Sequence, residues 1–113
     1  MIEKKQVKVG NVICGSDQLF LICGPCVIEK ESMMLSTAEK LKNISLDLNI
    51  PLIFKSSFSK DNRSSLDYYQ GPGLDEGLRI LEKIKKEFEL PLLTDIHYPD
   101  QANPTSEVVD ILQ

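Results

Sequence analysis

The chain has little of what marks a membrane, secreted or nucleic-acid-binding protein. Its longest apolar runs, such as Leu19 to Cys23, are only a few residues long, so no segment can cross a membrane as a helix. Met1 to Lys5 are mostly charged or polar, so we expect no signal peptide. Lys and Arg number 13 against 17 Asp and Glu, a net charge of −4. Because there is no basic block either, nucleic acid is not expected as the main partner.

Histidine and cysteine are also scarce. His97 is the single histidine, so the chain cannot build a multi-histidine metal site alone. Three cysteines without a secretion signal indicate a reducing, cytoplasmic setting, and their odd number leaves at least one thiol unpaired. The 113 residues are enough for one domain with its own core, but too few for a closed (β/α)8 barrel, which needs at least ~200 residues.

What the chain does contain is an alternation of short apolar runs and amphipathic stretches. Val7 to Ile13, with Gly10-Asn11 at its centre, is typical of a β-hairpin. The elements expected after it are strand 19–23, helix 31–48, strand 51–54, helix 74–88, strand 91–96, a short helix near 101–104 and strand 108–112. This alternation predicts an α/β fold with a parallel sheet and right-handed crossovers. We expect the hairpin to occupy residues 1–17 and the sheet with its helices residues 18–113.

Several of these segments carry a prediction about burial. The run 19–23 is continuously apolar, which is typical of a strand buried on both faces. Helix 31–48 has apolar residues three or four apart, which predict a core-facing stripe of Met34, Ala38, Leu41, Ile44 and Leu48. The corresponding stripe of helix 74–88 is Leu74, Leu78, Leu81, Ile84 and Phe88.

Polar residues gather where the expected strands end, which is where parallel α/β folds carry their chemistry. The loop 55–65 holds three cations and five serines, which favours binding of a phosphate or carboxylate; a solvated surface loop is the alternative. Gly71-Pro72-Gly73 is either an anion cradle or, as we prefer, a rigid turn. Strand alternation places Asp95 and His97 on one side.

The cysteines differ in context. Cys23 lies inside an apolar run and is expected in the core, whereas Cys14 is uninformative. Cys26 follows Gly24-Pro25 at the end of the first strand of the expected sheet. Taken alone it is most often an inert residue, and a metal-ligand role needs other ligands nearby.

Six segments, in their order along the chain, together resemble one enzyme family. They are Gly24-Pro25-Cys26-Val27-Ile28-Glu29, Phe54-Lys55-Ser56-Ser57-Phe58, Lys60-Asp61-Asn62-Arg63-Ser64-Ser65, Gly71-Pro72-Gly73-Leu74, Thr94-Asp95-Ile96-His97 and Val109-Asp110-Ile111-Leu112-Gln113. The sequence resembles the 3-deoxy-D-manno-octulosonate 8-phosphate synthases. The resemblance spans essentially the whole chain and implies the amino-terminal part of a (β/α)8 TIM barrel. That part comprises about four strands and a preceding hairpin, with the barrel not closed in this chain.

The resemblance implies a cytoplasmic transferase that condenses phosphoenolpyruvate with D-arabinose 5-phosphate and releases phosphate. The product feeds Kdo and lipopolysaccharide biosynthesis, the family assembles as a homotetramer, and neither nucleic acid nor membrane is a partner. The matching positions are Lys55, Lys60 and Gln113 for phosphoenolpyruvate, Asn62, Arg63 and Ser64 for arabinose 5-phosphate, and Asp95 and His97 for catalysis.

The resemblance also implies a metal. Metal-dependent members have Cys where Cys26 stands and metal-independent members have Asn, so Cys26 is similar to one ligand of a divalent metal ion. The identity of the metal stays open, and its other ligands would lie outside this chain. The related 3-deoxy-D-arabino-heptulosonate 7-phosphate synthases share Gly-Pro-Cys, but their basic loop typically reads Lys-Pro-Arg-Thr-Ser-Pro. Asn62 before Arg63 favours arabinose 5-phosphate as the acceptor.

Four positions depart from the usual pattern of the family, and they are Ser59, Asp61, Gln70 and Tyr98. Asp61 adds a negative charge beside Lys60 and Arg63, from which we expect weaker phosphate affinity. The competing interpretation is a non-catalytic remnant, because the last expected strand would be left as an open edge. We therefore expect the 113-residue chain to show no synthase activity by itself.

Overall fold

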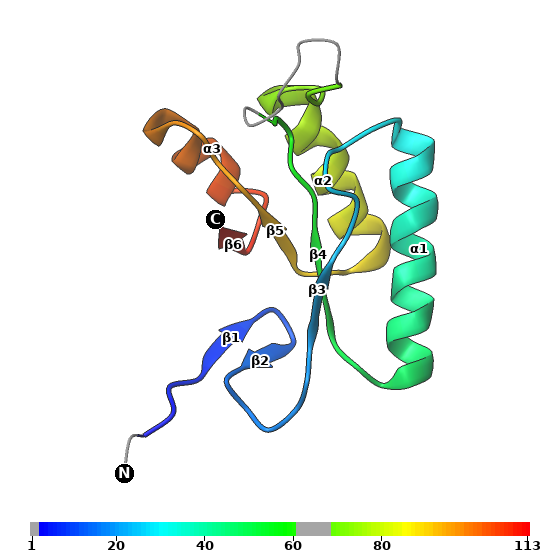
Figure 1. The fold of residues 1–113 in the computed structure, drawn as a ribbon, viewed down its shortest axis with the longest axis vertical. Coiled ribbons are helices and arrows are strands. Elements are labelled where there is room, and N and C mark those ends of the chain that lie inside the picture. Colours follow the sequence, from blue (N-terminus) through cyan, green and yellow to red (C-terminus); the bar gives the residue numbers. More distant parts are fainter. Residues whose placement is uncertain (1–2, 61–68) are drawn as a thin grey trace.

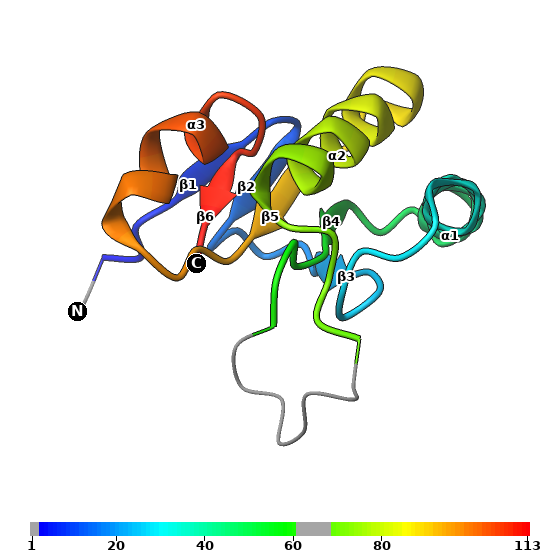
Figure 2. The same ribbon diagram turned by 90° about the horizontal axis from the view of Figure 1, so that it is seen from above.

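The computed structural model describes residues 3–60 and 69–113 and shows a curved parallel sheet with helices along one side (Figures 1 and 2). The strands of this sheet, in their spatial order, are β3 (Leu21–Cys23), β4 (Leu52–Lys55), β5 (Leu92–Thr94) and β6 (Ile111–Leu112). The helices between them are α1 (Glu31–Leu48), α2 (Leu74–Phe88), the 3-10 turn η1 (Pro99–Gln101) and α3 (Ala102–Ser106). The predicted α/β chain with a four-stranded parallel sheet is confirmed, and within the described residues this sheet is open, not closed.

The predicted hairpin is also confirmed. Strand β1 (Val7–Val9) pairs antiparallel with β2 (Val12–Cys14) around Gly10-Asn11. Val9 and Val12 pack with Ile53 of β4 and Leu93 of β5 in a small core cluster. Figure 1 shows the hairpin near the end of the sheet where the strands begin. It therefore leaves the opposite end, where the strands finish, uncovered.

The main core lies between the sheet and the helices α1 and α2. Both helices have the predicted bounds, and α1 ends at Asn49 in the left-handed conformation, with φ 54°. The stripe of α2 contacts this core through buried Leu78, Leu81 and Ile84, with Leu74 and Phe88 at its margin. The sheet contributes Leu52, Phe54 and Leu92. None of the helices in the described part of the chain is long and apolar enough to span a membrane.

Two burial predictions are wrong. The run 19–23 is not buried on both faces, because Leu19 precedes the strand and β3 is an edge of the sheet; Ile22 is 46% exposed. Its neighbour Ile53 on β4 is fully buried because the hairpin covers it. The stripe of α1 is buried only in its first half, and Ile44 and Leu48 are exposed, because α1 packs mainly on α2 and β4.

The strands differ from their predicted bounds. The strand predicted at 51–54 is shifted to Leu52–Lys55, and the one predicted at 91–96 ends at Thr94. The strand predicted at 108–112 is reduced to Ile111–Leu112 because the N–H groups of Val108 and Val109 donate to the Thr105 carbonyl at the end of α3. Asp95 and His97 therefore lie in the segment that leaves β5, not in the strand itself.

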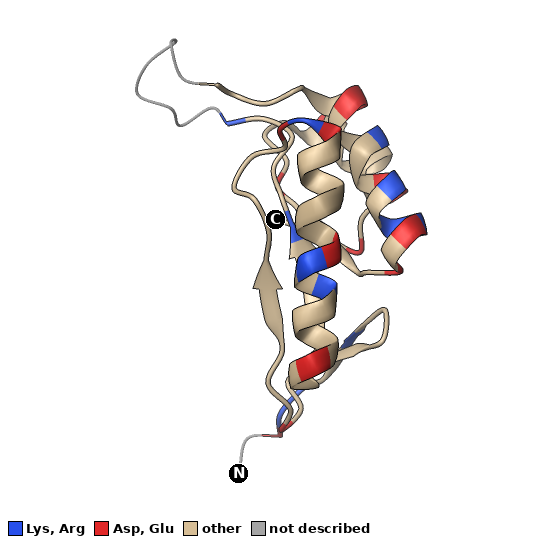
Figure 3. Ribbon diagram, turned by 90° about the vertical axis from the view of Figure 1, so that its right-hand side faces the viewer, with Lys and Arg blue, Asp and Glu red and all other residues tan. Residues whose placement is uncertain are grey.

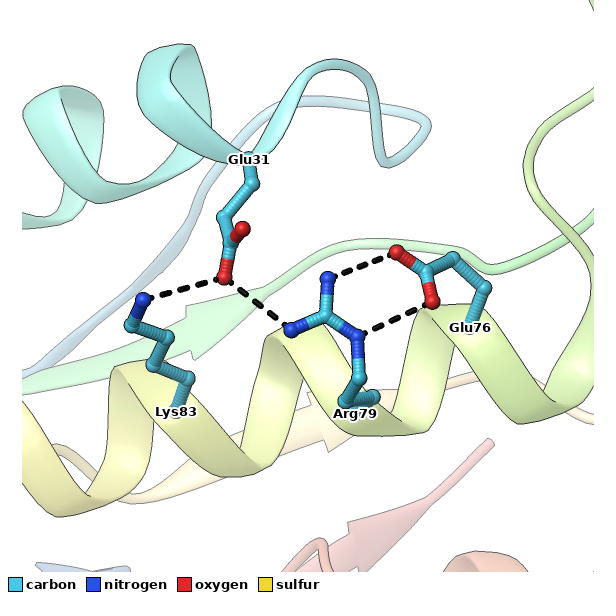
Figure 4. Close-up of polar contacts among 4 residues, drawn as sticks. All are labelled: Glu31, Glu76, Arg79 and Lys83. Carbon is cyan, nitrogen blue, oxygen red and sulfur yellow. Dashed lines mark hydrogen bonds and ion pairs between the residues drawn. The ribbon is translucent and has the colours of Figure 1, made fainter.

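Charged residues are distributed along α1 and α2, whereas the strands carry few (Figure 3). One network joins the two helices (Figure 4). Glu31 Oε1, at the start of α1, lies 3.2 Å from both Arg79 Nη1 and Lys83 Nζ of α2. Arg79 also donates to both carboxylate oxygens of Glu76, at 2.6 and 2.9 Å. These hydrogen bonds, above all those from Arg79, hold the pKa of each glutamate below its usual value.

Candidate active site

A hollow of about 350 Å³ lies where β3 and β4 end. It is lined by Ile22, Cys23, Gly24, Pro25, Cys26, Lys55 and Lys60. Lys55 is the last residue of β4, and the backbone N–H of Lys60 donates to the Gln70 carbonyl at 2.8 Å. Within residues 3–60 and 69–113, neither lysine side chain has a hydrogen-bond or ion-pair partner. Two unpaired ammonium groups on one hollow attract an anion.

Gly24 lets the chain after β3 approach the end of β4. A Cβ added at Gly24 would lie 2.0 Å from the carbonyl oxygen of Lys55, a distance that no side chain can adopt. The absence of a side chain at Gly24 therefore brings Cys26 to the same hollow as Lys55.

Ser56 and Ser57 hold the segment that follows Gly24. The Ser56 hydroxyl donates to the Pro25 carbonyl at 2.6 Å. The Ser57 N–H donates to the Cys26 carbonyl at 3.2 Å, and the Ile28 N–H donates to the Ser57 carbonyl at 2.9 Å. The backbone around Cys26 is thus fixed on both sides, while Cys26 itself is exposed.

Asp95 and His97 lie together where the chain leaves β5. His97 Nε2 is 3.3 Å from Asp95 Oδ2 and 2.9 Å from the Ser59 carbonyl oxygen. Because both neighbours accept hydrogen bonds, the arrangement requires a proton on Nε2. The Ser57 hydroxyl donates to the other Asp95 oxygen, and the His97 ring meets Phe58 edge-on at 6.1 Å between centroids. A carboxylate oriented by a hydroxyl and facing an imidazole can hold and move a proton.

Of the remaining predicted site residues, the structure describes only Gln113. Gln113 follows β6, and its N–H donates to the Thr94 carbonyl while its carbonyl accepts from the Ile96 N–H, both at 3.0 Å. It therefore lies beside the Asp95 segment. Asn62, Arg63 and Ser64, together with the departure Asp61, lie outside the described residues.

Gly71-Pro72-Gly73 has the geometry of a rigid turn. Gly71 and Gly73 have φ of 109° and 90°, conformations that side chains rarely adopt. The Gly73 N–H donates to the Phe58 carbonyl at 3.0 Å. This arrangement favours the turn interpretation, with the motif joining the end of the loop to the start of α2.

The described residues do not by themselves fit a metal ion. Among them, no group of three or more His, Cys, Asp or Glu side chains comes close enough to hold one. Cys26 offers one exposed thiol to the hollow, whereas burial raises the pKa of the Cys23 thiol and disfavours its thiolate. Any metal held by Cys26 would need its other ligands from outside this set.

The serines of the loop 55–65 are predicted to help bind an anion, but the hydroxyls of Ser56 and Ser57 donate to the Pro25 carbonyl and to Asp95 instead. The sequence predicts no role for the hydroxyl of Thr94. Thr94 Oγ1 donates to the Ser56 carbonyl at 2.7 Å, and both residues are fully buried. The sequence gives one indication of these contacts. Ser56 follows an apolar strand and Thr94 ends one, at positions where an apolar residue would be expected.

Comparison with known proteins shows the family of the chain. The DAHP synthetase I family is matched over residues 1–113. The chain is 52% identical over 110 residues to the 2-dehydro-3-deoxyphosphooctonate aldolase of Geobacter metallireducens, covering 96% of the chain and 40% of that protein. It is 53% identical over 96 residues to the protein of the same name from Campylobacter jejuni, covering 85% of the chain and 35% of that protein. The corresponding protein of Desulfatibacillum aliphaticivorans is 53% identical over 103 residues, which are 91% of the chain and 37% of that protein.

The chain thus spans about two-fifths of the length of these curated relatives. The matched region includes the strand-end segments that form the hollow and the Asp95–His97 pair. With a family match over every residue, the chain belongs to the DAHP synthetase I family.

Proposed function

We propose that the chain forms the amino-terminal part of a 3-deoxy-D-manno-octulosonate 8-phosphate synthase. The observation that carries the proposal is the identity of about half of all residues with relatives named 2-dehydro-3-deoxyphosphooctonate aldolase. In this proposal the four strands are the first part of a (β/α)8 barrel, which in the complete protein closes around the hollow. The enzyme would work in the cytoplasm as a homotetramer.

Phosphoenolpyruvate fits the hollow by charge. Its carboxylate and phosphate are anionic, and Lys55 and Lys60 present two ammonium groups without a described partner. Gln113, next to the Asp95 segment, would add a neutral donor. The segment Asn62-Arg63-Ser64, which follows Lys60 closely in sequence, would bind arabinose 5-phosphate.

The condensation joins the methylene carbon of phosphoenolpyruvate to the aldehyde carbon of arabinose 5-phosphate. The aldehyde oxygen takes a proton, and water adds to the former enol carbon and gives up a proton. The bond between that carbon and the phosphate oxygen then breaks, the new hydroxyl loses its proton to form the ketone, and phosphate leaves. In this proposal the Asp95–His97 pair holds and moves a proton of the reaction, because a carboxylate lies against the imidazole there. The lysines would stabilise the negative charge carried by the phosphate as it departs.

We also propose Cys26 as one ligand of a divalent metal ion. Such an ion, when bound, polarises a carbonyl or lowers the pKa of a bound water. The proposal is supported by the exposed thiol of Cys26 at the hollow that also holds Lys55. Among the described residues no three His, Cys, Asp or Glu side chains come together, so further ligands of such an ion would come from outside them.

A chimaera tests the proposed function. The chain would replace the matching segment of the Geobacter metallireducens relative, which supplies the remaining three-fifths. We expect phosphate release that requires both phosphoenolpyruvate and arabinose 5-phosphate. Loss of one charged hydrogen bond in Lys60→Met should raise the KM for phosphoenolpyruvate about tenfold or more. The control Lys40→Met changes an exposed lysine of α1 and should leave the KM unchanged.

Two outcomes would contradict the proposal. A folded chimaera without phosphate release would exclude a working synthase segment and favour an inactive remnant. Phosphate release that does not depend on arabinose 5-phosphate would overturn the assignment of the acceptor.

A further inference from the structure

A row of side-chain hydroxyls crosses the end of the sheet. Thr94, at the end of β5, donates its hydroxyl to the carbonyl of Ser56, which follows β4, at 2.7 Å. Ser56 in turn donates its hydroxyl to the carbonyl of Pro25, which follows β3, at 2.6 Å. Both side chains are fully buried, with no exposed surface. Three neighbouring strands are thus joined by two hydroxyl–carbonyl hydrogen bonds.

The two hydroxyl bonds lie where the regular backbone hydrogen bonding between β3 and β4 ends. Pro25 has no N–H, so the chain after β3 cannot continue regular pairing with β4 at that residue. The Ser56 N–H donates to the Leu93 carbonyl at 3.3 Å, and the Ser56 hydroxyl is what reaches Pro25. A buried hydroxyl is unfavourable unless it is hydrogen-bonded, so an apolar residue would serve packing alone equally well.

Each of the three residues joined by these bonds is next in sequence to a residue of the candidate site. Pro25 precedes Cys26, Ser56 follows Lys55, and Thr94 precedes Asp95. Fixing these peptides fixes the points from which the thiol, the ammonium group and the carboxylate project.

We infer that Ser56 and Thr94 are positioning residues that hold the Cys26 segment in a fixed relation to Lys55 and Asp95. The roles of Cys26, Lys55 and Asp95 in this inference rest on the proposed function. The hydroxyl row itself can be tested without any substrate.

Amide hydrogen exchange of the 113-residue chain tests the inference. Loss of the Ser56 hydroxyl should release the segment whose Ile28 N–H donates to the Ser57 carbonyl. In Ser56→Ala, exchange at Ile28 should rise about fivefold, as expected for one lost hydrogen bond. The Leu81 amide in the buried part of α2 serves as the reference, because global destabilisation would raise both rates together.

Matched variants separate positioning from packing. Thr94→Val keeps the shape but removes the hydroxyl and should also raise exchange at Ile28, whereas Thr94→Ser keeps the hydroxyl and should restore protection. Ser45→Ala removes a hydroxyl–carbonyl bond to Ile50, at the far end of α1, and should have no such effect. If Ser56→Ala does not fold, the comparison of Thr94→Val with Thr94→Ser tests the inference.

Exchange at Ile28 that rises no more than at Leu81, or that rises equally in Ser45→Ala, would overturn the inference. Failure of the proposed function has a different signature. In that case the chimaera would lack phosphate release while Ser56→Ala still accelerated exchange at Ile28.

Discussion

At the residue scale, Gly24 determines how closely two strand ends approach. Its backbone does not have a positive φ, so the reason for glycine is the carbonyl of Lys55, which would lie 2.0 Å from an added Cβ. Any larger residue must push the Cys26 segment away from β4. The proximity of the Cys26 thiol to the lysines therefore depends on the absence of a side chain at Gly24.

We predict that Gly24→Ala lowers the free energy of unfolding by about 1–3 kcal/mol, as overpacking generally does. Urea denaturation of the chain measures this change. Gly73→Ala is the comparison, because Gly73 has φ 90° but nothing within 4 Å of an added Cβ, so it reports backbone strain without a clash. Gly24→Ala should also accelerate exchange at Ile28, and Gly73→Ala should not. A Gly24→Ala chain as stable as the parent would contradict the steric argument.

Some predicted site residues lie near one another because strand ends gather at one edge, while their roles stay predictions. Lys55 and Lys60 meet Cys26 at one hollow, and Asp95 meets His97. The roles of the serines were not predictable in the same way. Whether Ser56 reaches Pro25 depends on the register between β3 and β4, which the sequence does not specify.

At the element scale, Glu31 and Arg79 connect the start of α1 to α2 (Figure 4). Hydrogen bonds from Arg79 lower the pKa of Glu31 and of Glu76. A carboxylate whose pKa is lower in the folded state stabilises that state above its ordinary pKa, and this stabilisation is lost as the pH falls through the folded value. The network therefore supports the packing of the helices at neutral pH and loses its effect in acid.

We predict that Arg79→Met makes the free energy of unfolding less sensitive to pH below the ordinary glutamate pKa of about 4.3. At neutral pH the variant should be slightly less stable, and the difference should shrink in high salt because these groups are exposed. Urea denaturation at a series of pH values measures both effects. Lys86→Met, which removes an ion pair within α2 only, serves as the control. An acid profile of Arg79→Met that parallels the parent would contradict the stabilising role of the network.

Helices were predicted more accurately than strands, and the reason is physical. The bounds of α1 and α2 follow from local apolar spacing and from end signals such as Asn49. A strand is defined by its partners, so β3 is short and half-exposed although its sequence is as apolar as that of β4. The exposure of Ile44 and Leu48 has the same origin, since burial depends on which neighbours are present.

At the scale of the whole molecule, the 113 residues are too few for a closed barrel, yet their strand order suits the first part of one. The hairpin covers Ile53 and Leu93 at the beginning of the strands, whereas Ile22 is exposed beside the hollow. Within the described residues the sheet that carries Lys55 is open and does not close into a barrel. A site that must exclude water around two anionic substrates needs additional residues to enclose it.

We therefore predict that the 113-residue chain does not turn over phosphoenolpyruvate and arabinose 5-phosphate, although the chimaera does. Phosphate release by the chain at high concentration, with both substrates and with or without a divalent metal, is the measurement. Catalysis demands that the reacting atoms be held close together, and here the described residues line an open hollow without closing it. Substrate-dependent release by the chain, abolished by Lys60→Met but not by Lys40→Met, would show that these residues suffice. That result would place the essential chemistry in the first four strands.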